Sequence, residues 1–219
     1  MKKLLFAVAT LTFSLVAAAL ANENPSFKTP TYSGPLNASE KVFVASIQKD
    51  LGARFPTAAT AESAGYVRYT SEDETGAISY ANRQWQSNDW KHPSQLWYDK
   101  HGMLLGADFS QLKTGNFPPH LWGINSGRWW EFDRHMHWVA RDPKTGKTTY
   151  DHYMADDDWI AVGGSLTDPQ PATLVKLGKV KNAADVVTVF NFPAVWDLIV
   201  WVKPNPNGAF AEKNPLVQP

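Results

Sequence analysis

The sequence predicts an α+β protein: a single domain dominated by an antiparallel β-sheet or a partly closed barrel, with N-terminal helices and short helices before the last strand. Two observations predict this class. Helical spacing of apolar residues is concentrated in residues 37–64, whereas strand-like runs separated by turn residues dominate the chain from residue 66 onward. No internal repeat and no break in composition marks a second domain, so we assign residues 37–219 to one β-rich domain.

The first 21 residues have the pattern of a secretory signal peptide. Lys2 and Lys3 form a basic start, residues 4–20 are almost wholly apolar, and the segment ends in an A-x-A cleavage signal. We expect cleavage after Ala21 and a periplasmic or secreted mature protein. Residues 22–36 contain three prolines and are expected to form a flexible leader. No later stretch has the roughly 18 apolar residues that a membrane helix needs, so no membrane span is expected in the mature chain.

The composition excludes several classes of function. The chain has no cysteine, which excludes disulfides, thiolate metal ligands and a thiol nucleophile. Its 21 basic and 21 acidic residues balance, and no basic run is present, so no nucleic-acid interface is expected. The ten tryptophans are notable because Trp-rich sheets can bind sugars or flat ligands, although tryptophan more often serves packing.

Two helices are expected after the leader. Asn37 can cap the first, and Glu40 can complete a capping box. The apolar residues that follow recur at helical spacing up to Gly52, where the helix is expected to end: Val44, Ile47 and Leu51. The second helix is expected over Thr57 to Ala64, with Thr57 as its cap and Gly65 as its stop.

The rest of the chain predicts strands with two further short helices. Lys100-His101-Gly102 predicts a hairpin turn. Short helices are expected at 172–177 and 183–190, the second capped by Asn182, and the turn-rich tail after residue 202 is expected to lie over the surface. The strand candidates are 66–70, 77–85, 95–98, 103–109, 128–141, 148–154, 159–162 and 196–202.

The run WWEFDRHMHWVARDPKTGKTTYDHYM, residues 129–154, predicts a β-hairpin. Its loop is expected at Pro143–Gly146, since proline suits the first turn position and glycine the left-handed position. Asp142 would then face Lys147, and His137 would fall directly opposite His152. A slip of one residue in this register would move His152 to the other face of the sheet.

This register predicts a metal site. Alternation along the strands places Glu131, Asp133, His135 and His137 on one face, with His152 across from them. Three imidazoles, or two with a carboxylate, form an open coordination set for Zn, Fe or Cu, which would activate a bound water or substrate. Glu131 or Asp133 would act as a further ligand, an orienting group or a general base.

His120 is an accessory candidate, because it follows two prolines on a loop that could fold over the predicted metal site. Three functions remain open at this point. The first is metal-dependent hydrolytic or oxidative chemistry on a small molecule. The second is a non-catalytic module that binds a small ligand or sugar in a Trp-rich pocket. The third is a structural envelope protein without a site.

Several motifs resemble a family of uncharacterised exported bacterial proteins. The likeness runs from about Lys41 to Val217 and implies export and a single compact domain, but it assigns no activity. Many members of this family carry a histidine where this chain has Ser79. If that histidine is a ligand, either the family site is absent here or the ligand set shifts onto His135, His137 and His152. The motifs are AESAGY (61–66), GAISYAN (76–82), PSQLWYD (93–99), GMLLGADF (102–109) and, most specific, WDLIVWVKPNPNGAFAEKNPLV (196–217).

Overall fold

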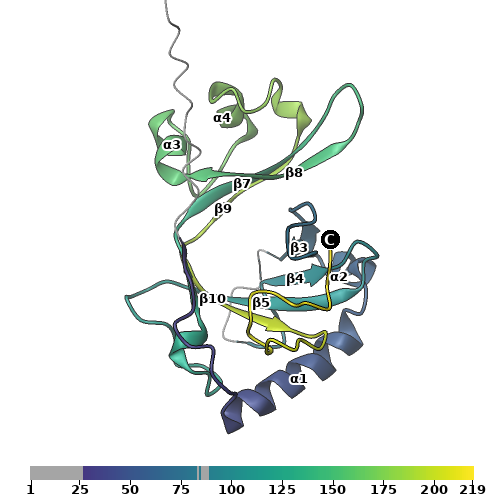
Figure 1. The fold of residues 1–219 in the computed structure, drawn as a ribbon. Coiled ribbons are helices and arrows are strands. Elements are labelled where there is room, and N and C mark those ends of the chain that lie inside the picture. Colours follow the sequence, from purple (N-terminus) through teal and green to yellow (C-terminus); the bar gives the residue numbers. More distant parts are fainter. Residues whose placement is uncertain (1–26, 83, 85–88) are drawn as a thin grey trace, which may run out of the picture.

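The computed structural model describes residues 27–82, 84 and 89–219 (Figure 1). The predicted signal peptide, the start of the leader and the end of the predicted strand 77–85 lie outside these residues. No helix in the described part of the chain is long and apolar enough to cross a membrane. The helices are α1 (Ala38–Arg54), α2 (Ala58–Ser63), α3 (Asp156–Ala161) and α4 (Pro171–Lys176), with 3-10 turns η1 (Ser126–Arg128) and η2 (Ala183–Asp185).

The predicted α+β class with dominant antiparallel sheet is confirmed, and the strands form two sheets. The smaller sheet has three strands in the order β8 (Thr148–Ala155), β7 (His135–Arg141) and β9 (Val186–Phe192). The larger has seven, and its outer strands do not close it into a barrel within the described chain. Its order is β1 (Phe27–Lys28), β6 (Trp130–Phe132), β10 (Val195–Trp201), β5 (Leu104–Leu112), β4 (Gln95–Tyr98), β3 (Ile78–Ala81) and β2 (Val67–Arg68).

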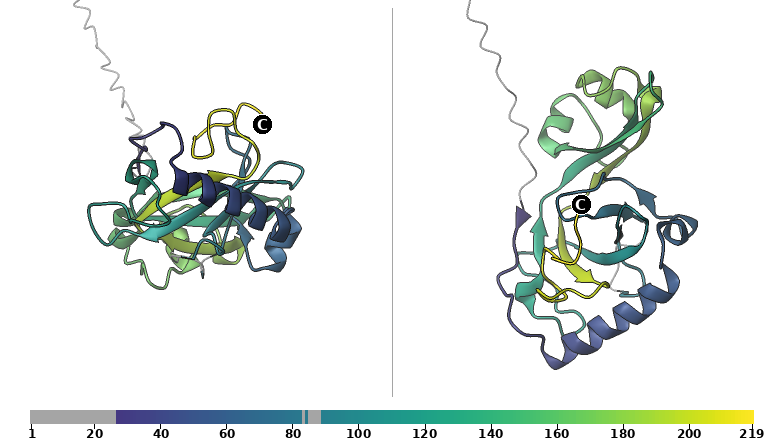
Figure 2. Two further views of the ribbon diagram at one scale, coloured as in Figure 1. Left: turned by 90° about the horizontal axis from the view of Figure 1, so that it is seen from below. Right: turned by 45° about the vertical axis from the view of Figure 1, so that its right-hand side comes forward.

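Helix α1 begins with the predicted capping box. The Glu40 amide donates to Asn37 Oδ1 at 2.8 Å, and the Asn37 amide donates to Glu40 Oε2 at 2.9 Å. The helix continues two residues beyond Gly52 to Arg54. It lies across one face of the seven-stranded sheet (Figure 2, left) and packs there through four buried side chains, Phe43, Val44, Ile47 and Leu51.

Alternation gives the central strands β4, β5 and β10 two different faces, with one irregularity in the β4–β5 pairing between Trp97 and Tyr98. Along β4, Leu96 and Tyr98 pack toward α1, whereas Gln95 and Trp97 face the opposite side. The same alternation in β5 and β10 sends these apolar side chains toward the helix: Ala107, Phe109, Trp196, Leu198 and Val200. The opposite face carries Asp108, Asp197, Ile199 and Trp201.

The chain passes twice between the sheets, from β6 to β7 and from β9 to β10. The two sheets therefore form two lobes joined by these crossings (Figures 1 and 2). Helices α3 and α4 cover the outer face of the three-stranded sheet. The core beneath them consists of Met136, Trp138, Met154, Trp159 and Leu174.

Three predicted elements are wrong. The strand expected over 128–141 is interrupted, because β6 and β7 belong to different sheets. The strand expected over 159–162 is the end of α3, which places three aspartates in its first turn, where carboxylates favour a helix start. The helix expected over 183–190 is η2 followed by β9, and the β-branched run Val186 to Val189 explains the strand.

The last part of the predicted leader, from Phe27 onward, makes backbone hydrogen bonds to the rest of the domain. Phe27 and Lys28 form β1, which pairs with β6. The amides of Thr31 and Tyr32 both donate to the Gly127 carbonyl at 2.9 Å. The prediction of a flexible leader is therefore wrong for this part, because backbone pairing holds it against the larger sheet.

Candidate functional site

The predicted hairpin is present, and its turn has the predicted geometry. The Asp142 amide donates to the Lys147 carbonyl at 2.8 Å, and Gly146 has the left-handed φ of 69° that the turn requires. Next to the turn, Arg141 pairs with Thr148, in the predicted register.

Further from the turn the register changes. An irregularity in the pairing between Trp138 and Ala140 shifts β7 by one residue against β8. His137 consequently pairs with Tyr153, and His152 pairs with Trp138. The prediction that His137 faces His152 is therefore wrong, because one extra residue in a strand reverses the alternation beyond it. The side chain of His152 lies outside the described residues, so this correction rests on the backbone pairing.

The two carboxylates predicted to serve the metal site do not line the cavity described below. Glu131 lies on β6 and forms ion pairs with Lys113 and, at 2.9 Å, with Lys28; these partners hold the pKa of Glu131 below its ordinary value. Asp133 is exposed, in the two-residue crossing between β6 and β7. That crossing ends the alternation on which the prediction depended. His120 is likewise exposed and away from the cavity.

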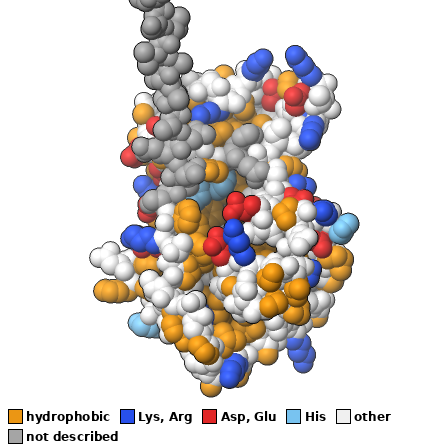
Figure 3. Space-filling view, in the orientation of Figure 1, with side chains coloured by type: hydrophobic (Ala, Val, Ile, Leu, Met, Phe, Trp, Pro, Cys, Tyr) orange, Lys and Arg blue, Asp and Glu red, His pale blue; other side chains and the backbone are white. Residues whose placement is uncertain are grey.

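A cavity of about 510 Å³ lies between the two sheets. Figure 3 shows it as a hollow with histidine and hydrophobic side chains inside and acidic side chains at its edge. Its volume is in the range of small-molecule sites, and such sites are typically lined by aromatic groups with a few polar ones. Strands of both sheets and the segment between β2 and β3 supply the aromatic side chains among its described lining residues, which are Phe27, Tyr69, Trp97, Trp130, Phe132, Tyr153, Phe192 and Trp201.

Two of the predicted ligands, His135 and His137, line this cavity. Their ring centroids are 4.7 Å apart, and each ring stacks on a phenylalanine of β9: His135 on Phe192 at 5.0 Å and His137 on Phe190 at 5.4 Å. His135 Nδ1 donates to the Asp133 carbonyl at 2.7 Å. Burial lowers the pKa of His135, so this imidazole is neutral at pH 7.

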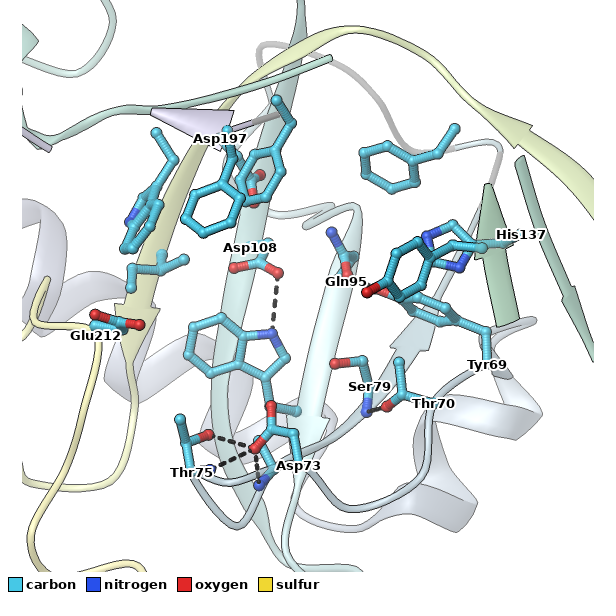
Figure 4. A pocket seen from close by; sticks show the side chains of 18 of the residues that line it. Tyr69, Thr70, Asp73, Thr75, Ser79, Gln95, Asp108, His137, Asp197 and Glu212 are labelled. Atoms are coloured by element: carbon cyan, nitrogen blue, oxygen red, sulfur yellow. Dashed lines mark hydrogen bonds between the residues drawn. The ribbon is translucent and has the colours of Figure 1, made fainter. Parts of the chain in front are cut away.

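Opposite the histidines, the cavity contains a pair of buried aspartates. Asp108 of β5 pairs with Ile199, and Asp197 of β10 pairs with Ser110, so the two aspartates are diagonal neighbours on the same face. Asp108 is 6% exposed and Asp197 is 4% exposed. In Figure 4, Asp108 lies between Asp197 and the indole that donates to it.

The two aspartates have few donors. Trp97 Nε1 donates to Asp108 Oδ2 at 3.0 Å, and Ser110 Oγ donates to Asp197 Oδ1 at 2.8 Å. Asp108 Oδ1 is buried and has no hydrogen-bond partner within the described residues. A buried polar atom without a partner is uncommon and is one sign of a ligand that completes the site.

Burial strongly disfavours charge on this pair. Burial and the neighbouring Asp197 raise the pKa of Asp108 well above its ordinary value, although the bond from Trp97 opposes this. Burial likewise raises the pKa of Asp197 to about 7, against the effect of the Ser110 hydroxyl. The empty pair therefore holds a proton at neutral pH. Buried carboxyls with raised pKa values are frequent at functional sites.

Gly106 of β5 sets the position of the Trp97 indole. A Cβ at Gly106 would lie 2.7 Å from Trp97 Cε3 and 2.7 Å from the Val200 carbonyl oxygen, closer than real contacts allow. The absence of a side chain thus lets the ring lie against the strand, where its Nε1 reaches Asp108. Ser79 also lines this cavity.

Asp108 and Asp197 were missed as candidates, although the sequence contains a signal for each. Both are charged residues within otherwise apolar strands, in GADF and WDLIVW, and a charged side chain at such a position is rarely buried without a role. No local sequence pattern indicates that the aspartates share a cavity with His135 and His137. Each aspartate lies at least 27 positions from the histidines along the chain and in the other sheet.

The fold and cavity define the class: an antiparallel α+β protein with a ligand-sized, aromatic cavity between two sheets. No family model, curated protein or solved structure matches the chain.

Proposed function

We propose that this protein binds a small organic molecule in the cavity between its two sheets. The observation that carries the proposal is the aromatic lining of a cavity of about 510 Å³ by strands of both sheets. Of the functions considered from the sequence, this agrees best with the binding module in its aromatic lining. The histidines, which we expected outside such a cleft, also line the cavity. Aromatic rings contribute large contact areas to a ligand while losing little conformational entropy.

Contacts across the mouth of the cavity support a preformed site. Tyr69, between β2 and β3, packs edge-on against His137 of β7 with centroids 5.3 Å apart. Its hydroxyl donates to Gln95 of β4. Arg68 lies over the Tyr150 ring at 4.3 Å. The contacts of Tyr69 with His137 and of Arg68 with Tyr150 join the two sheets, and the bond to Gln95 holds Tyr69 in place, so we expect the cavity to keep its shape without ligand.

Filling the cavity is expected to abolish ligand binding. Ser79 lines the cavity, so Ser79→Phe places a ring in the ligand volume. Ser63 is exposed on α2, so Ser63→Phe is the matched control. A small-molecule panel is screened by quenching of tryptophan fluorescence, and we expect a ligand from the panel to quench the parent protein. Ser79→Phe is expected to bind this ligand at least tenfold more weakly, and Ser63→Phe to bind it as the parent does. Equal affinity in all three folded proteins would place the ligand elsewhere and contradict the proposal.

His135 and His137 favour a second candidate function, binding of Zn, Cu or Fe. They offer two imidazoles in one cavity, but the described residues contain no group of three His, Cys, Asp or Glu that could hold a metal ion. A metal would therefore need further ligands from substrate or solvent.

The metal function has its own measurement. If it is correct, mature protein purified without chelator or a His tag is expected to carry near-stoichiometric metal, which His135→Ala/His137→Ala loses while staying folded. Absence of metal from both proteins after incubation with Zn, Cu and Fe salts would contradict it and leave the organic ligand.

A further inference from the structure

We infer that the ligand is a small organic cation, an amine or quaternary ammonium with an apolar body, and that Asp108 and Asp197 supply its counter-charge. This inference rests on the proposed function, because it names the chemical class of ligand for the same cavity. Three features of the cavity carry it: the sign of its charged groups, the arrangement of its aromatic rings and the unpartnered oxygen of Asp108.

Among the described residues that line the cavity, every Asp, Glu, Lys or Arg side chain is an acidic one. Asp108 and Asp197 lie inside it, no Lys or Arg is among the described residues that line it, and the remaining carboxylates are exposed at its edge: Asp73, Glu74 and Glu212. Lys213 is nearby, but it is exposed and pairs with Glu74 at 3.6 Å. Once ionised, these carboxylates repel an anionic ligand and attract a cation.

Aromatic rings flank the two aspartates on both sides. Trp97 and Trp201 form an edge-to-face pair with centroids 5.5 Å apart and an interplanar angle of 68°. Across β10, Trp130 pairs with Asp197 in the sheet and stacks near Phe132 at 6.2 Å. The negative faces of aromatic rings attract ammonium groups, and several rings around a carboxyl are a suitable environment for a desolvated cation.

Asp108 Oδ1 is the third feature. It is buried without a hydrogen-bond partner in the described chain, although its side chain points into the cavity beside Asp197 (Figure 4). Leaving such an acceptor unsatisfied is unfavourable, and an ammonium N–H or the positive methyl groups of a quaternary ammonium would satisfy it. A neutral apolar ligand would leave it unpaired.

Binding of a cation is expected to release a proton from the aspartate pair. Because the pair holds a proton at neutral pH, binding of the cation releases a proton to solvent. Affinity for a non-titrating cation therefore increases as pH rises through about 7, the raised pKa of Asp197. The other titratable groups among the described residues that line the cavity come from four places. They are Tyr69, Asp73 and Glu74 from the β2–β3 region, His135 and His137 from β7, Tyr153 from β8, and Glu212 from the C-terminal segment. His135 is already neutral at pH 7, so it does not supply this proton.

The test compares two probes of the same shape, choline and its uncharged carbon isostere 3,3-dimethylbutan-1-ol, with benzyltrimethylammonium as a larger cation and glucose as a neutral polyol. Each is titrated by calorimetry into the mature protein at pH 5.5, 7.0 and 8.5. We expect each cation to bind at least tenfold more tightly than the isostere and glucose, with affinity increasing with pH.

Two variants with the same change of charge complete the test. Asp197→Asn removes the counter-charge and is expected to weaken cation binding at least tenfold at pH 8.5. Asp158→Asn, on the exposed side of α3, is expected to leave it unchanged. Binding that depends on the cavity is identified by its loss in Ser79→Phe.

The outcomes separate the two proposals. Binding of only the neutral probes, abolished by Ser79→Phe, would overturn the cation inference and retain the ligand cavity. Cation binding that is insensitive to both Asp197→Asn and pH would also overturn the cation inference. Failure of every probe in this set and of the broader panel to bind in the cavity would overturn both.

Discussion

Asp197→Asn is expected to raise the free energy of unfolding at pH 8.5 by up to about 4 kcal/mol, while changing it little at pH 4. Asp197 is 4% exposed, and burial raises its pKa from the ordinary 3.8 to about 7. Asparagine has the shape of the protonated acid, and its Oδ1 can still accept the hydrogen bond that Ser110 donates. The substitution therefore retains the contacts and removes only the charge.

The direction of the pH effect follows from proton binding. Between pH 3.8 and about 7 the folded state binds more protons at Asp197 than the unfolded state does, so the parent protein loses stability as pH rises through this window and reaches a plateau above it. Asp108 adds a loss of the same sign, because its pKa is also raised. The variant should retain only the part due to Asp108.

Urea denaturation of ligand-free parent and Asp197→Asn at pH 4, 5.5, 7 and 8.5 measures both curves. Parallel curves for the two proteins would show that Asp197 titrates normally and would contradict the assignment of a protonated pair. If the pair has the proposed binding role, the variant gains stability and loses cation affinity together, as is common when a functional charge is buried.

Glu40→Ala is expected to lower the free energy of unfolding by about 3–5 kcal/mol, the range for breaking a buried ion pair from one side. Glu40 is 0% exposed and Arg128 is 5% exposed. Arg128 Nε donates to Glu40 Oε1 at 3.1 Å, and the Asn125 amide donates to the same oxygen at 3.0 Å. The substitution would leave the Arg128 guanidinium buried without its carboxylate and also remove half of the capping box of α1 with Asn37.

The hydrogen bonds of Glu40 also explain its ionisation. Burial alone would raise the pKa of Glu40, but hydrogen bonds from Arg128 and from the Asn37 and Asn125 amides outweigh this and hold it below its ordinary value of 4.5. Its contribution to stability is therefore present above pH 4.5 and is lost as pH falls through the lowered pKa.

A double-mutant cycle checks the Glu40 prediction. Glu40→Ala, Arg128→Met and the double variant are compared by urea denaturation at pH 7, with Glu62→Ala on the exposed side of α2 as a control that should change stability little. We expect the double variant to be less destabilised than the two single changes added together. Additive effects, or a loss below about 1 kcal/mol in Glu40→Ala, would show that the pair is weakly coupled.

The site was only partly predictable, for a reason visible in β7. The H-x-H spacing correctly placed His135 and His137 on one face of a strand, because alternation is a local property of extended chain. The partner of that strand was predicted from the turn alone. The turn does set the pairing next to it, but the irregularity between Trp138 and Ala140 moves His152 out of register. The residues of the turn carry no information about the packing around the distant part of this strand, so the change of register could not be predicted from them.

By itself, the sequence determined the features that depend on neighbouring residues: the capping box of α1, the turns around Gly102 and Gly146, and the alternating strands β4, β5 and β10. Only the tertiary structure decided that β6 and β7 belong to different sheets, and that β9 is a strand. Those outcomes depend on burial against segments distant in sequence, which override local propensity. For the same reason, only the packing of one sheet against the other brings Asp108 and Asp197 into a shared cavity with His135 and His137.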